Sequence, residues 1–276
     1  MGILRLTAPL VLTALTVFIV DRSMLRRKLL PPLFRADQAG SELVARMRRG
    51  FAAACLAGVF YLAVFSPISL VGQTVEPDLS EVGTAQLFIV HAILALVLTL
   101  WYVAGYVPRP ARGGWWDEFG LRAHNLGREI LIGGVAGAGI WLAVIVLLLF
   151  LVGLITLLGG AETLPQSPPS VVLWMAGLPA AVRVLVALSA GFFEEVFFRG
   201  FLQPRIGVAL STVLFTLAHL SYQQPFMLVG VAVLSIFFAM LVRWRQSIWA
   251  AITAHAVFDL VQLLVILPMG ARALNS

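Results

Sequence analysis

The chain has 276 residues, of which 61% are hydrophobic and 12% are charged, and its mean hydropathy is +0.98. Soluble domains are about half apolar and about one-quarter charged, so this composition excludes an ordinary soluble domain and indicates a polytopic membrane protein. The formal net charge is +6. The basic residues are grouped in short segments between apolar runs, which is typical of membrane topology rather than of nucleic-acid binding. Because Cys55 is the single cysteine, an intrachain disulfide is excluded.

Eight apolar segments are long enough, at about 20 residues each, to cross a hydrocarbon core of about 30 Å. They lie at residues 3–20, 51–71, 85–106, 129–158, 171–203, 206–222, 226–242 and 247–267. The fourth and fifth are longer than a crossing requires, so we expect them to tilt or break, and Pro179 is the expected break in the fifth. The fourth has small residues at helical spacing, which favours close helix packing: Gly133, Gly134, Gly137 and Gly139.

The loops between these segments alternate in charge. The loops at 21–50 and 107–128 are rich in arginine, whereas the loop at 72–84 has no Lys or Arg and contains Glu76, Asp78 and Glu81. Cytoplasmic loops are enriched in Lys and Arg, so the alternation predicts eight spans with both termini outside.

No long soluble segment interrupts the apolar pattern, so we predict one all-α membrane domain over residues 1–276. The spans within 1–160 carry no recognisable motif, and the spans within 171–267 carry the polar residues that need an explanation. We expect a multi-pass protein of a bacterial-type inner membrane.

Two adjacent acids, Glu194 and Glu195, lie in the fifth apolar segment. A charge in hydrocarbon costs on the order of 3 kcal/mol or more, so acids inside a membrane generally serve a function. Glu195 lies four residues before Arg199, on the same helical face, and the two can neutralise each other. Glu194 lies about 100° around the helix and has no basic residue at helical spacing, so its partner must come from another helix.

The later spans supply candidate partners. His219 lies in the sixth span one turn after Phe215, whose ring can fix the imidazole rotamer. His255 and Asp259 lie four residues apart on one side of the eighth span. At about 1.5 Å per residue from the predicted cytoplasmic ends, Glu194 and these three polar side chains fall in one layer, reached from the cytoplasmic half.

This set of side chains suits two kinds of chemistry. Glu194 with a histidine can deprotonate a water molecule for attack on a peptide carbonyl, while His255 and Asp259 donate or orient hydrogen bonds at the oxyanion. Alternatively, Glu194, His219 and His255 form a two-histidine, one-carboxylate set that could bind zinc. The sequence lacks the compact His-Glu-x-x-His motif of the zincins, so zinc is the second choice and no cofactor is expected.

The three elements EExxxR, FxxxH and HxxxD, in this order on late spans, resemble the CPBP family of CAAX prenyl endopeptidases of the Ras-converting type and bacteriocin-processing proteins. The resemblance covers about the last hundred residues. It implies that Glu194 activates water with help from His219, that His255 and Asp259 serve the oxyanion, and that Glu195 and Arg199 are supporting residues. The third motif often ends in Asn in the family, and an ionised Asp259 accepts but cannot donate. The implied substrate is a peptide or protein at the lipid bilayer.

Other interpretations stay open at this level. Glu194 could be a structural acid paired with Arg183, Arg199 or Arg205, and His91 in the third span, without a polar residue at helical spacing, is interpreted as a packing or hydrogen-bonded histidine. A proton-coupled transporter could use the buried Glu, His and Asp as a relay. A haem-binding electron carrier could use His219 and His255 as axial ligands, but would leave the acids unexplained.

Overall fold

The computed structural model describes residues 2–70, 83–109, 113–164, 170–222 and 224–274. All regular elements in these ranges are helical, which confirms the predicted all-α class. The α-helices are α1 (Gly2–Arg26), α2 (Ala36–Ala39), α3 (Glu42–Val59), α4 (Thr84–Tyr106), α5 (Gly114–Glu118), α6 (Leu126–Leu157), α7 (Ser170–Gly177), α8 (Ala180–Glu195), α9 (Gln203–Ile206), α10 (Val208–Ala218), α11 (Pro225–Arg245), α12 (Trp249–Val261) and α13 (Leu267–Leu274). Three segments are π-helical: η2 (Phe60–Phe65), η5 (Val196–Leu202) and η7 (Gln262–Ile266). The short 3₁₀ turns are η1 (Pro32–Phe34), η3 (Ser66–Leu70), η4 (Ala161–Thr163) and η6 (Leu220–Tyr222).

Six helical stretches in the described ranges are long and apolar enough to cross a membrane. They are Thr7–Arg26, Glu42–Ser69, Thr84–Tyr106, Leu126–Leu157, Pro225–Arg245 and Trp249–Gly270. The protein is therefore a multi-pass membrane protein. The predicted fifth and sixth spans are also helical, but the fifth carries charged residues and α10 in the sixth has only 11 residues, fewer than the about 20 that a crossing needs. The count of eight spans stays a prediction.

The two long segments differ in how they accommodate their length. The fourth forms one unbroken helix, α6, of 32 residues, which is about 48 Å long and must tilt or project. The fifth breaks between Gly177 and Ala180, where Pro179 is the N-cap of α8. Because proline has no backbone N–H and fixes its own φ, it suits the start of a helix and not the interior. The predicted break is confirmed.

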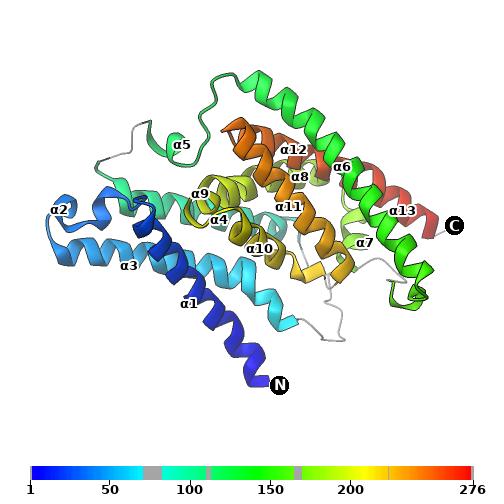
Figure 1. The fold of residues 1–276 in the computed structure, drawn as a ribbon, viewed down its shortest axis with the longest axis horizontal. Coiled ribbons are helices and arrows are strands. Elements are labelled where there is room, and N and C mark those ends of the chain that lie inside the picture. Colours follow the sequence, from blue (N-terminus) through cyan, green and yellow to red (C-terminus); the bar gives the residue numbers. More distant parts are fainter. Residues whose placement is uncertain (1, 71–82, 110–112, 165–169, 223, 275–276) are drawn as a thin grey trace.

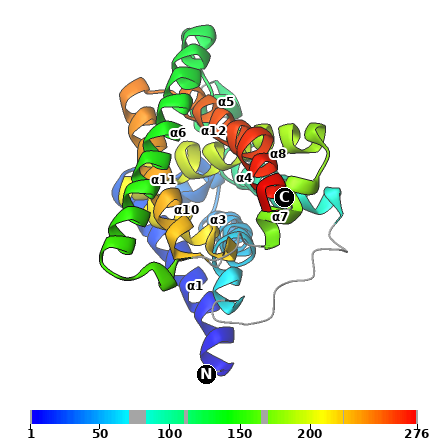
Figure 2. The same cartoon turned by 90° about the vertical axis from the view of Figure 1, so that its right-hand side faces the viewer.

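Helix α12, which carries two of the candidate site residues, packs against both α6 and α8, as Figures 1 and 2 show. Glycines make these approaches possible. A Cβ atom on Gly133 would lie 2.5 Å from the carbonyl oxygen of Ala250, and one on Gly137 would lie 2.6 Å from that of Ala254. On the other side, a Cβ on Gly191 would lie 2.9 Å from the amide nitrogen of Ala256.

The expectation of close packing is thus right for Gly133 and Gly137 and wrong for Gly134 and Gly139. A Cβ on either of the latter two would meet no atom within 4 Å. The reason is helical phase, since adjacent residues lie about 100° apart and only one row of the helix faces α12.

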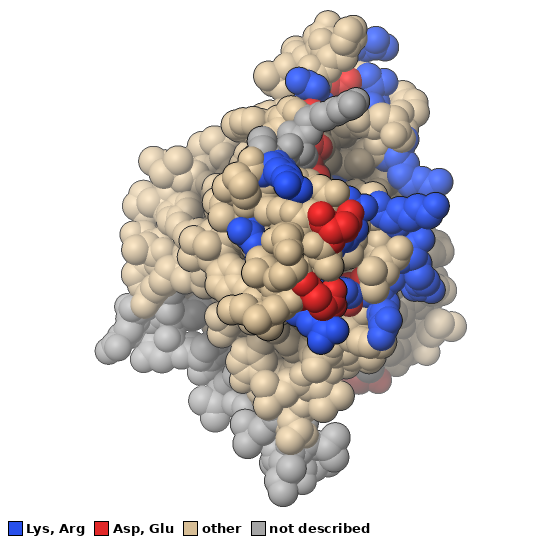
Figure 3. Space-filling view, turned by 90° about the vertical axis from the view of Figure 1, so that its left-hand side faces the viewer, with Lys and Arg blue, Asp and Glu red and all other residues tan. Residues whose placement is uncertain are grey.

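One end of the bundle collects the basic segments, and Figure 3 shows Lys and Arg side chains gathered on this face. Contacts between helix ends hold it together. Arg48, near the start of α3, donates to the carbonyl oxygens of Ala104 and Val107 at the end of α4. Arg245, at the end of α11, forms an ion pair with Glu129 near the start of α6. The basic loops that were predicted to lie on the same side of the membrane therefore meet at one end of the bundle. The acidic loop with Glu76, Asp78 and Glu81 lies outside the described residues.

Candidate active site

A cavity of about 280 Å³ opens between α4, α6, α7, α8, α10, α11 and α12. Its polar lining consists of all four predicted site residues and two others: His91, Glu194, His219, His255, Asp259 and Gln262. The remaining wall is mostly apolar, with Val171 and Met175 from α7 and Met227 and Leu234 from α11. The prediction that the polar side chains of three late spans share one layer agrees with this arrangement.

Glu194 projects from the last turn of α8 and keeps 18% of its side chain exposed. Each of its carboxylate oxygens faces a different imidazole. Oε1 lies 3.8 Å from Nε2 of His91, and Oε2 lies 3.9 Å from Nε2 of His219. Both separations exceed a direct hydrogen bond of about 2.7 to 3.2 Å. The carboxylate thus lies between two imidazole nitrogen atoms without a direct hydrogen bond to either.

His219 follows α10 and is fixed by the residue one turn before it. Its Nδ1 lies 2.8 Å from the carbonyl oxygen of Phe215, and the two rings lie 4.7 Å apart between centroids. A carbonyl oxygen only accepts, so Nδ1 carries the proton and Nε2 is directed toward Glu194. The predicted packing of Phe215 on this imidazole is confirmed.

Glu195 has a different environment from its neighbour. Its side chain is fully buried, Oε2 lies 3.2 Å from Nε of Arg199, and Oε1 lies 2.9 Å from Nδ1 of His255. The ion pair with Arg199 confirms the prediction from helical spacing. The bond to His255 was not expected from spacing, since it joins α8 to α12.

The guanidinium group of Arg199 is buried among aromatic rings. It lies 4.3 Å from the ring centroid of Phe215 and 5.6 Å from that of Phe238. Its Nη2 also donates to the carbonyl and hydroxyl oxygens of Ser235 on α11. Cation–π contacts and charge-assisted hydrogen bonds compensate in part for the desolvation of this charge. Arg199 therefore links α8, α10 and α11 and holds Glu195 in place.

His255 is positioned from three directions. Its ring stacks on Phe238 at 4.9 Å between centroids, Nδ1 donates to Glu195, and Nε2 faces Oδ2 of Asp259 at 3.5 Å. A carboxylate only accepts, so the bond to Glu195 fixes the proton on Nδ1. Of Glu195, His255 and Asp259, Asp259 is the most exposed, with 24% of its side chain accessible. The buried Glu195 thus orients His255 toward the cavity.

His91 is the site residue that sequence reasoning missed. It lies on α4, stacks on Phe193 with 6.0 Å between centroids, and lines the cavity beside Glu194. The stacking on Phe193 agrees with the interpretation of His91 as a packing or hydrogen-bonded histidine, and its polar neighbour stands on α8 instead of on its own helix. An ionisable side chain in an apolar span was the one available signal.

The alternative that Glu194 is the structural partner of an arginine is not supported by the contacts. Arg183 donates to the carbonyl oxygen of Leu263, and Arg205 pairs with Glu118. Arg199 pairs with Glu195. Each of the three candidate arginines therefore has another partner.

The proposed zinc set does not fit this arrangement. Within the described ranges, no group of three or more His, Cys, Asp or Glu side chains is placed to hold a metal ion. His255 is directed to Glu195 and Asp259, whereas His219 is directed to Glu194. The two imidazoles of the set thus serve different carboxylates.

The fold and the site define a helical multi-pass membrane protein with a buried Glu/His centre. Residues 176–261, which contain all three motifs, match the family described as type II CAAX prenyl endopeptidase Rce1-like. The resemblance to this peptidase family, predicted from the three motifs, is therefore confirmed for residues 176–261.

One curated relative is the uncharacterized protein YpbD of Bacillus subtilis (strain 168), which is 29% identical over 79 residues. The match covers 28% of this chain and 42% of the relative, so less than half of that protein's length is represented. No solved structure matches the chain significantly.

Proposed function

We propose that the protein is an intramembrane endopeptidase that hydrolyses a peptide bond in a membrane-proximal or lipid-modified peptide. The observation that carries this proposal is the placement of Glu194 between the imidazoles of His91 and His219 in a mostly apolar cavity. A carboxylate beside imidazole groups is suited to take a proton from water. The family of residues 176–261 supplies the reaction class.

In this mechanism Glu194 is the general base. It accepts a proton from a water molecule, whose oxygen forms a bond to the carbonyl carbon of the peptide. The same carboxyl group then gives the proton to the amide nitrogen as the C–N bond breaks, which yields a carboxylic acid and an amine. His219 presents Nε2 toward the water, because its Nδ1 is held by the Phe215 carbonyl.

His255 and Asp259 serve the other side of the reaction. With Nδ1 of His255 engaged by Glu195, Nε2 is the atom that can donate, when protonated, to the oxyanion of the tetrahedral intermediate. An ionised Asp259 cannot donate. We therefore assign Asp259 the role of orienting His255, because Oδ2 of Asp259 lies 3.5 Å from Nε2 of His255. Glu195 and Arg199 are assigned the role of supporting residues.

The cavity wall supports an apolar substrate. Side chains from α6, α7 and α11, such as Leu148, Met175 and Met227, line it beside the polar groups. Pockets with mostly apolar walls and few polar groups orient a ligand through those polar groups. A peptide with an apolar or lipid-bearing side chain next to the scissile bond fits this cavity, because the side chain can contact the apolar wall while the peptide bond lies at the polar groups.

We infer that the basic end of the bundle faces the cytoplasm and that both termini lie outside, with the site nearer the cytoplasmic side. The support is the gathering of Lys and Arg side chains on one face (Figure 3), because positively charged loops are retained in the cytoplasm.

We expect no resident metal, and no step in the mechanism requires one. Elemental analysis of active protein, combined with a chelator titration, tests this expectation. Stoichiometric zinc, with activity lost on its removal and restored on its addition, would overturn the glutamate mechanism.

The most direct experiment compares membrane proteomes of cells that carry the wild type or Glu194→Gln. New protein termini that depend on Glu194 support the proposal. Exposed Glu42→Gln is the matched control and should give the wild-type termini. If both variants give the same termini as wild type, the peptidase proposal is wrong, and a proton-coupled transporter that uses the same buried groups becomes the better hypothesis.

A further inference from the structure

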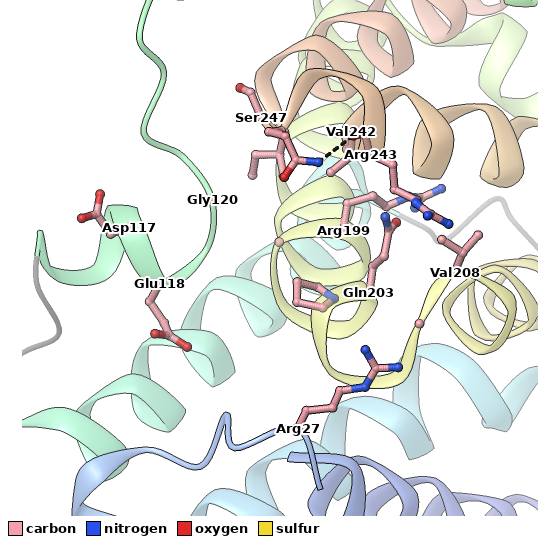
Figure 4. Close-up of a pocket in the computed structure, with 15 residues that line it drawn as sticks. Arg27, Asp117, Glu118, Gly120, Arg199, Gln203, Val208, Val242, Arg243 and Ser247 are labelled. Carbon is pink, nitrogen blue, oxygen red and sulfur yellow. Dashed lines mark hydrogen bonds between the residues drawn. The ribbon is translucent and has the colours of Figure 1, made fainter. Parts of the chain in front are cut away.

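A second pocket, of about 570 Å³, lies at the basic end of the bundle, away from the polar residues of the candidate site other than Arg199. Figure 4 shows the side chains that line it. They come from the end of α1, from α5, from η5 and α9, from the start of α10 and from the α11–α12 connection. Five of them carry charge: Arg27, Asp117, Glu118, Arg199 and Arg243.

The two acids of this pocket are already neutralised. Asp117 forms an ion pair with Arg122 at 3.0 Å, and Glu118 pairs with Arg205 and accepts from the hydroxyl group of Tyr106. Both acids lie on α5, on the opposite side of the opening from Val208 in Figure 4. They therefore do not serve as partners for Arg27 and Arg243, the two exposed arginines of the pocket.

Arg27 and Arg243 are exposed and form no ion pair within the described part of the chain. Figure 4 shows Arg27 extending from the α1 side, and Arg243 from the α11 side, toward the space beside Val208. Val208 is the first residue of α10. Two unpaired guanidinium groups thus converge on a helix N-terminus.

The position of Arg27 is unfavourable without an anion. A Cβ atom on Gly207, the N-cap of α10, would lie 3.6 Å from Nη2 of Arg27, and no side chain caps this helix. The N-terminus of a helix carries about half a positive charge and unpaired amide N–H groups. A cation placed there is repelled, whereas an anion between the two positive groups would be attracted by both.

The floor of the pocket has unused hydrogen-bonding capacity. Arg199 and Gln203 both line it and are 99% and 92% buried, and each keeps one polar atom without a hydrogen-bond partner among the described residues. These atoms are Nη1 of Arg199, which is a donor, and Oε1 of Gln203, which is an acceptor. The unpaired buried donor of Arg199 is costly and indicates a missing acceptor, whereas the oxygen of Gln203 does not support an anion.

We propose that this pocket binds a phosphate group through Arg27, Arg243 and the N-terminus of α10. Guanidinium groups bind phosphate oxygens through paired hydrogen bonds, and helix N-termini are favourable sites for the same group. The phosphate belongs to a lipid headgroup or is free in solution, and the pocket offers both the same chemistry.

The test uses the full chain purified in an uncharged detergent, with the thermal unfolding midpoint as the readout. One series titrates inorganic phosphate against chloride and acetate at equal ionic strength. A second series adds phosphatidylglycerol, with diacylglycerol as the control that lacks the phosphate. We expect the midpoint to rise with phosphatidylglycerol, with inorganic phosphate, or with both. A rise with the lipid alone identifies the headgroup as the source, and a rise with inorganic phosphate identifies a site for the free ion.

Variants separate this pocket from general attraction to a basic surface. Arg27→Gln and Arg243→Gln should each weaken the response about tenfold, the scale of one charge-assisted interaction. Arg26→Gln changes the net charge equally at an exposed neighbour that does not line the pocket, so it should respond like wild type. No rise in either series, an equal rise with acetate, or an equal loss in Arg26→Gln would overturn the proposal.

Discussion

The side chains of Glu195 and His255, which are 60 residues apart in the chain, meet in a hydrogen bond of 2.9 Å between Oε1 and Nδ1. The adjacent Glu194 instead faces His91 and His219. Two neighbouring glutamates on one helix thus serve two different parts of the site. The buried one fixes an imidazole on α12, and the more accessible one lines the cavity.

Glu194→Gln should leave the fold intact and lower peptidase activity by about 10²- to 10⁴-fold, the usual contribution of a general base. The two side chains are nearly equal in size, but an amide cannot accept a proton from water. The measurement is the rate of formation of Glu194-dependent termini in the membrane proteome, with circular dichroism of the purified variant as the check on folding. Cleavage at the wild-type rate would contradict the assignment of the base.

Glu195→Ala should instead lower stability, by about 3 kcal/mol or more, because it leaves Arg199 buried without its partner. The matched control is Glu42→Ala, which removes one partner of the exposed pair with Arg46 and should cost less than about 1 kcal/mol. Thermal unfolding in detergent compares the two variants. Equal midpoints would show that the buried pair does not support the fold.

His91→Gln should lower kcat about tenfold with little change in KM, because it removes one of the two imidazole groups that flank the Glu194 carboxylate. His124→Gln, at an exposed position in the loop before α6, is the control and should match wild type. Steady-state kinetics on a substrate identified from the proteome comparison provides both constants. An unchanged kcat in His91→Gln would return this residue to a packing role.

Gly137→Ala should destabilise the protein by about 1 to 3 kcal/mol, because the new methyl group would lie 2.6 Å from the Ala254 carbonyl oxygen and force α12 away from α6. Gly134→Ala, on the same helix with no atom within 4 Å of the new methyl group, should be neutral or slightly stabilising. The unfolding midpoints of the two variants test this contrast. A milder effect at Gly137 than at Gly134 would mean that α12 does not depend on this contact.

Sequence reasoning could find what lies within one helix. The spacing of Glu195 and Arg199 predicted their ion pair, the spacing of Phe215 and His219 predicted the ring contact, and Pro179 predicted the break before α8. Each of these depends on the repeat of 3.6 residues per turn or on a local backbone constraint. No knowledge of how helices are arranged was needed.

The contacts between residues of different helices depend on how the helices are arranged, and sequence reasoning did not predict them. His91 meets Glu194 because α4 packs on α8, and His255 meets Glu195 because Gly191 lets α12 approach α8 closely. Spacing along one chain does not reveal such contacts, since they depend on which helices become neighbours and on their rotation. For the same reason, sequence spacing could not separate Gly133 and Gly137 from Gly134 and Gly139.

The close contacts of α12 also limit how this site can change over evolution. Ala250 and Ala254 face glycines of α6, and Ala256 faces Gly191 of α8, so neither side of the helix has room for a larger residue. Phe258 of α12 and Gln262 of the following η7 line the cavity instead. A descendant of this protein could therefore acquire a new substrate preference by changing these cavity residues, while the positions that clamp α12 stay small and keep His255 in place.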